Sequence, residues 1–143
     1  MQLEAAEADV LAAEASAFAR ALPDPSASAR YERLAAAAAA RDIPDDLLAP
    51  LQTMLELLFT TGRVTNRAVL QSVFARTPRG RQLAAAAREV NRALRTLRGQ
   101  TLTDVRLSAA GPSQQSLVIE TDRCRLTLEL DRDGARIASL EAG

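Results

Sequence analysis

The chain has 143 residues, enough for one ordinary domain with a substantial hydrophobic core. It carries 18 basic residues, all of them arginine, and 18 acidic residues, so the formal net charge is zero. With no histidine and one cysteine, the composition excludes an internal disulfide and the usual catalytic sets built on histidine.

The spacing of apolar residues predicts four helices in the first half of the chain, over residues 2–22, 27–41, 44–61 and 66–76. The first has a thin apolar stripe, so we expect it to pack on a neighbouring helix or on a second copy. The serines at 26 and 28 are expected to cap the second helix. The third is apolar around most of its circumference, which predicts a central buried helix that ends at Gly62.

A fifth helix, over residues 78–98, is the best marked of all. Thr77 is a suitable cap, Pro78 suits the first helical position and Gly99 suits the exit. At about 100° per residue the apolar side chains fall on one stripe. That stripe contains Leu83, Ala87, Val90, Leu94 and Leu97. The opposite face contains Arg81, Arg88, Arg92 and Arg95.

After Gly99 the hydrophobic period changes to two, which predicts strands. We expect four, over residues 101–108, 115–121, 124–130 and 135–140, with a loop over 109–113 and a tight turn at Gly134. Short connections imply an antiparallel meander with one polar face and one face covered by the preceding helices.

The predicted fold class is therefore α+β: about five helices followed by a four-stranded antiparallel meander packed against the later helices. We expect one domain over residues 1–143. Within it, residues 1–43 form peripheral alanine-rich helices, residues 44–99 the core helices and residues 100–143 the sheet.

Charge is unevenly distributed along the chain. Residues 1–60 have a net charge of −6, residues 61–100 of +8 and residues 101–143 of −2. Two interpretations follow. In the first, the charges have no binding role, because the acidic N-terminal helices lie beside the basic helix or both faces are simply solvated. In the second, the arginine face meets an acidic partner or a nucleic acid.

Few residues favour catalysis, metal binding or a cofactor, and we predict none of the three. Cys124 lies on the apolar face of its strand, which is typical of a core thiol. Glu120 and Glu129 lie on neighbouring strands, where two carboxylates can form an acid–base pair, although any polar sheet face offers such pairs. The run Arg79-Gly80-Arg81 begins a helix, where free N–H groups and guanidinium groups favour an anion.

The N-terminus lacks the layout of a signal peptide and no stretch is long enough to span a membrane, so we expect a cytoplasmic protein of bacterial type. The predicted function is a small non-enzymatic protein-interaction or assembly module that self-associates and presents an arginine face to an acidic protein partner. The alternative is a nucleic-acid-binding protein that uses the helix pair 66–76 and 78–98. The predicted partner-binding or anion-binding residues are Arg79, Arg81, Arg88, Arg92 and Arg95.

Overall fold

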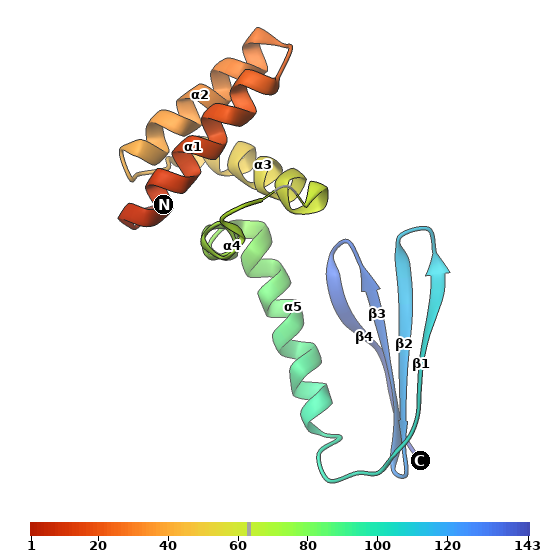
Figure 1. The fold of residues 1–143 in the computed structure, drawn as a ribbon. Helices are drawn as coiled ribbons and strands as arrows, with labels where there is room; N and C mark the ends of the chain where they lie inside the picture. The colour runs from red at the N-terminus through yellow and green to blue at the C-terminus, as the bar shows by residue number, and fades with distance from the viewer. Residues whose placement is uncertain (63) are drawn as a thin grey trace. The chain divides into compact units, whose positions relative to one another are not determined.

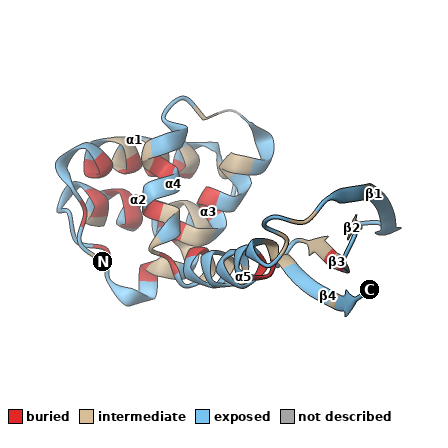
Figure 2. Ribbon diagram, turned by 90° about the horizontal axis from the view of Figure 1, so that it is seen from below, coloured by how far each residue is buried: buried red, intermediate tan, exposed pale blue. Residues whose placement is uncertain are grey.

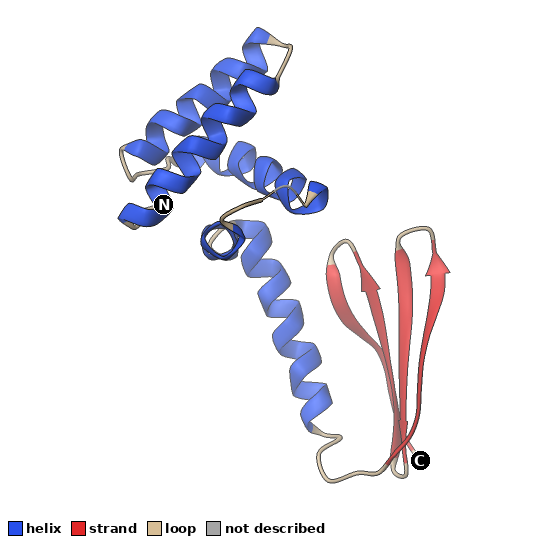
Figure 3. Ribbon diagram, viewed as in Figure 1, coloured by secondary structure: helices blue, strands red, loops and turns tan. Residues whose placement is uncertain are grey.

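A computed structural model describes residues 1–62 and 64–143. The α+β prediction is confirmed, because five α-helices precede a four-stranded antiparallel sheet in the described residues (Figures 1 and 3). The chain divides into two compact units, Met1–Gly80 and Arg81–Gly143, each with its own apolar cluster. Each unit is described by itself below, so the expectation of a single domain stays a prediction.

The first unit begins with a helical hairpin of α1 (Ala5–Ala21) and α2 (Pro25–Ala39), which lie side by side (Figure 1). Their facing sides are built largely from small residues, and Figure 2 shows the buried positions along both helices. The buried alanines are Ala8, Ala15, Ala19, Ala35 and Ala38. Because alanine has only a methyl group, the two backbones can approach closely.

Asp24 caps α2, and the serines expected in that role do not. Its carboxylate accepts hydrogen bonds from the N–H groups of Ser26 and Ala27 at 3.2 and 3.1 Å. Pro25 occupies the first helical position, where its missing N–H costs nothing. Ser28 lies inside the helix, and its hydroxyl donates to the Ala19 carbonyl at 3.0 Å.

The unit continues through a 3₁₀ turn (Asp45–Leu47), α3 (Leu48–Thr61) and α4 (Arg67–Ala75). α3 ends, as expected, at Gly62, whose φ of 70° lies in the left-handed region. The expectation that α3 is a central buried helix holds for Leu51, Met54 and Leu55, which are fully buried, but not for Leu57, which is 48% exposed. The helix buries one side only, since its neighbours in the first unit do not enclose its whole circumference.

The second unit consists of most of α5 (Pro78–Arg95) and the sheet. The strands are β1 (Leu102–Gly111), β2 (Gln114–Thr121), β3 (Cys124–Asp131) and β4 (Gly134–Ala142). They pair in the order β1-β2-β3-β4, all antiparallel, as a meander. The expected loop over 109–113 is wrong in extent, because β1 runs on to Gly111 and leaves a short turn.

α5 packs on the middle of the sheet and supplies its cover. Val90 and Ala93 of the helix are buried together with Leu126 and Leu128 of β3. The expected stripe is corrected at one position, because Ala87 is exposed and the inward side passes through Ala93 instead. The partly buried residues around this cluster are Leu94, Leu97, Leu117, Ile119 and Ala135. The arrangement leaves the far side of the helix free for polar groups.

Candidate interaction surface

The start of α5 is held by contacts within the first unit. The Thr77 hydroxyl accepts the N–H of Gly80 at 3.1 Å, so the predicted cap is confirmed. The next free donor, the N–H of Arg79, is taken by the Gln52 side-chain oxygen at 3.1 Å. Two N–H groups that would bind an anion at this helix start therefore already have acceptors within the protein.

Arg79 is set apart from the other arginines of α5. Its side chain is 19% exposed, and its Nε lies 3.7 Å from a carboxylate oxygen of Glu56 on α3. The difference follows the division of the chain, because Arg79 lies in the first unit, beside α3, whereas the other arginines of α5 lie in the second unit. Arg79 belongs to the packing of α5 on α3 rather than to the outer face.

Four arginines form one exposed stripe on the side of α5 that faces away from the sheet, and we call them the arginine stripe. Its members are Arg81, Arg88, Arg92 and Arg95. None of the four makes an ion pair with any residue that the structure describes. At 1.5 Å per residue the stripe extends over about 21 Å. It is a linear positive surface with unused hydrogen-bond donors.

The outer face of the sheet differs sharply, because its arginines are paired. Arg106 of β1 lies 2.8 Å from Glu120 of β2, and Arg125 of β3 approaches the same carboxylate at 3.4 Å. Arg136 of β4 binds Glu129 of β3 at 2.6 Å. These are surface pairs of small individual energy, but they neutralise the sheet face. They also show that Glu120 and Glu129 bind different arginines and do not form an acid–base pair.

The inner face of the sheet is wider than the helix that covers it. Val105 and Leu107 of β1 pair with Ile119 and Leu117, so they point to the same side as α5. On β4, Leu140 pairs with Leu126 and also points inward. One helix covers two strands, and the apolar residues of the outer strands stay between 40% and 60% exposed. Those residues are Leu102, Val105, Leu107, Ile137 and Leu140.

A buried polar group in the first unit engages the arginine that precedes α5. The Glu7 carboxylate accepts hydrogen bonds from Ser72 at 3.0 Å, from the Glu4 N–H at 2.9 Å and from Arg76. Burial alone raises the pKa of Glu7, but the hydrogen bonds and the Arg76 charge outweigh it and lower that pKa below 4.5. Arg76 also donates to the Gln2 carbonyl at 2.8 Å, so it is committed to holding α4 against the N-terminal segment.

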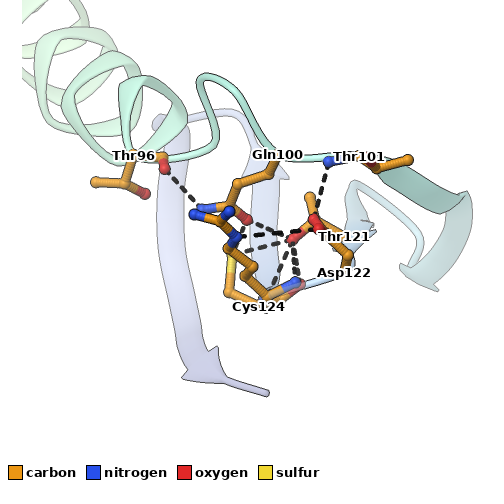
Figure 4. A network of polar contacts seen from close by, with 7 residues as sticks. Thr96, Gln100, Thr101, Thr121, Asp122 and Cys124 are labelled. Carbon is orange, nitrogen blue, oxygen red and sulfur yellow. Dashed lines mark hydrogen bonds and ion pairs between the residues drawn. The ribbon is translucent and has the colours of Figure 1, made fainter.

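Cys124 takes part in a small polar network at the end of the sheet (Figure 4). The Thr121 hydroxyl accepts the N–H of Cys124 at 2.9 Å and donates to the Gln100 side-chain oxygen. The Cys124 thiol donates to the same oxygen at 3.3 Å, and the Gln100 amide donates to the Thr96 carbonyl at 2.8 Å. The network ties the β2–β3 turn to the segment after α5. Its geometry is that of a structural cluster, with a half-buried thiol.

Neither protein-family models nor the curated proteins nor the solved structures give a significant match to the chain. Within residues 1–62 and 64–143, no three histidine, cysteine or carboxylate side chains gather as metal ligands would. In the same part of the chain, every helix is too short or too polar to span a bilayer.

The sequence located the arginine stripe but missed two features of this surface. The sequence indicates only an anion contact for Gly80, whereas the structure gives this residue a packing role against α4. The exposed apolar margins of the sheet were also missed. The signal for them was present, since four strands of alternating apolar residues need more cover than one helix of about 10 Å diameter provides.

Proposed function

We propose that the protein is a non-enzymatic interaction module that self-associates and binds an acidic protein partner through the arginine stripe. One observation carries the proposal: four exposed guanidinium groups lie along one helix face without ion pairs among the described residues. The sheet arginines of the same unit are neutralised by neighbouring carboxylates, so the unpaired charge is concentrated on α5. A surface of this kind favours a partner of opposite charge.

The stripe suits an acidic helix or extended acidic segment of comparable length. Arginine presents a planar fork that binds a carboxylate through two parallel hydrogen bonds, which adds orientation to the charge attraction. Each exposed pair contributes about 1 kcal/mol or less, so useful affinity needs several arginines engaged at once. Binding should therefore weaken strongly with salt.

An acidic protein partner is favoured over nucleic acid by the groups that surround the helix pair α4 and α5. Arg76, which links the two helices in sequence, is bonded to Glu7 and to the Gln2 carbonyl. Arg67 of α4 lies over the Phe59 ring at 5.5 Å from its centroid. Two cations that a helix-turn-helix arrangement would aim at phosphates are thus engaged within the protein.

The test uses fluorescence anisotropy with labelled poly-glutamate as the acidic probe, at low and moderate ionic strength. The test variant replaces the whole stripe by glutamine, as Arg81→Gln, Arg88→Gln, Arg92→Gln and Arg95→Gln. The control removes the same charge from exposed arginines elsewhere, as Arg20→Gln, Arg30→Gln, Arg41→Gln and Arg123→Gln.

We expect the stripe variant to lose binding by about tenfold or more, because four favourable contacts of a few tenths of a kcal/mol are removed. The control should keep most of the wild-type affinity. Equal losses in the two variants would mean that net charge, and not the stripe, governs binding. Tighter binding to a duplex DNA probe, with a steep dependence on salt, would favour the nucleic-acid alternative instead.

A further inference from the structure

We propose that two copies of the chain join through their β1 strands, which pair antiparallel and edge to edge about a two-fold axis at Val105. The inference rests on the self-association in the proposed function and names the surface that performs it. Paired in this way, the two four-stranded sheets become one continuous eight-stranded sheet with an α5 helix from each copy on the same side.

The first argument is that β1 is an open edge. It is the first strand in the order β1-β2-β3-β4, and among the described residues no other strand pairs with its outer side. The strand has ten residues, contains no proline and is exposed along almost its whole length. Natural proteins rarely leave such an edge bare, because its free N–H and C=O groups recruit another strand.

The second argument is charge complementarity of the strand with itself. Asp104 and Arg106 flank Val105, and both point to the outer face of the sheet, where Arg106 lies 3.0 Å from Asp104 of its own strand and 2.8 Å from Glu120. When Val105 of one copy faces Val105 of the other, Asp104 of each copy faces Arg106 of its partner. Two cross-strand pairs of opposite charge result.

Neighbouring registers lack this match. A shift that centres the axis on Arg106 places the two arginines opposite each other, and one that centres it on Asp104 opposes two carboxylates. Like charges directly opposite destabilise a strand pair. All three registers place residues of the same face opposite each other and keep the apolar side continuous, so charge decides between them and favours the Val105 register.

The third argument is apolar area. Leu102, Val105 and Leu107 lie on the α5 side of the sheet and are each about half exposed or more, at 60%, 49% and 60%. In the paired arrangement Val105 faces Val105 of the second copy, and Leu107 faces Thr103 on either side of it. The apolar residues of the two copies form one strip between the two α5 helices, which covers surface that a single copy leaves in water.

The opposite edge is less suited to pairing. β4 has a register shift between its partners Thr127 and Leu128, which places an extra residue in the middle of the strand. Such a bulge bends an edge and interrupts its row of backbone groups. The irregularities of β1 lie near its two ends, and the segment Asp104–Ala109 between them pairs regularly with β2.

The test measures the mass of the full chain by sedimentation equilibrium over a wide concentration range. Wild type should form dimers. Asp104→Arg and Arg106→Asp alone should each weaken dimerisation by about tenfold or more, because two attractive pairs become repulsive. The double variant Asp104→Arg/Arg106→Asp should restore dimers, and an equimolar mixture of the two single variants should form heterodimers.

Glu141→Arg is the matched control, since it makes the same charge change on the outer face of the opposite edge strand. It should dimerise like wild type, and circular dichroism should show that all variants keep the wild-type secondary structure. If wild type is a monomer at every concentration, both the self-association and the β1 interface are overturned. If Asp104→Arg and Arg106→Asp each dimerise like wild type, or if Glu141→Arg abolishes the dimer, the β1 interface is overturned while self-association stands.

Discussion

Replacing Gly80 by alanine should destabilise the first unit more than any exposed change on α5. A Cβ at this position would lie 2.0 Å from the Phe74 carbonyl oxygen and 2.8 Å from the Ala75 Cα, both backbone atoms that no rotamer change can move. Overpacking of this kind costs up to about 3 kcal/mol. Displacing the helix start also breaks the Thr77 cap, at about 1 kcal/mol. The better helix propensity of alanine returns about 1 kcal/mol, so we expect a net loss of about 3 kcal/mol.

The assay is urea unfolding followed by tyrosine fluorescence. Tyr31 is the only tyrosine and the chain has no tryptophan, so the signal reports the first unit alone. With an m-value of about 1.5 kcal/mol per molar, the midpoint should fall by about 2 M. Gln71→Ala, on the exposed side of α4 in the same unit, is the control and should leave the midpoint almost unchanged. A Gly80→Ala protein as stable as wild type would refute the close approach of α5 to α4.

Glu7→Gln should cost about 2 kcal/mol by the same fluorescence assay, because Arg76 then loses its buried partner charge. Folding lowers the pKa of Glu7, so the stability that its carboxylate contributes is present above pH 4.5 and is lost as the pH falls through the lower pKa of the folded state. The Glu7→Gln protein should therefore lose less stability in acid than wild type does. Leu126→Ala removes a fully buried side chain and should cost about 3 kcal/mol in unfolding followed by circular dichroism, whereas Thr127→Ala on the other face should cost under about 1 kcal/mol. Thr121→Val should speed hydrogen exchange at the Cys124 amide about tenfold or more, since that N–H loses its acceptor; an unchanged rate would contradict the network.

Periodicity predicted the elements of this fold well, since the strands of the meander alternate cleanly and α5 has a clear apolar side. What it could not predict depends on contacts between distant residues. The capping role of Asp24 follows from the local chain, yet two serines within four residues compete for that role. Gly80 could not be interpreted from sequence, because the carbonyl that requires it belongs to another helix.

The candidate surface could be predicted only in part, because some of it depends on contacts between residues that are distant in the sequence. The arginine stripe depends only on the geometry of one helix, so the sequence located Arg81, Arg88, Arg92 and Arg95 correctly on the outward side. Arg79 begins the same helix, but it lies beside Glu56 of α3, a contact that the sequence of α5 does not contain. The width of the sheet relative to its single covering helix is likewise a property of packing, which no local pattern contains.

The order of the strands has a consequence for how the second unit folds. Every strand pairs with its immediate neighbour in the chain, and α5 directly precedes the first of them. Contacts between residues close in sequence need little loop-closure entropy, so low contact order favours rapid acquisition of the native topology. Each strand can therefore pair with the strand before it as the sheet grows. The chain need not search for pairing partners over long sequence separations, which is the step that slows many β proteins.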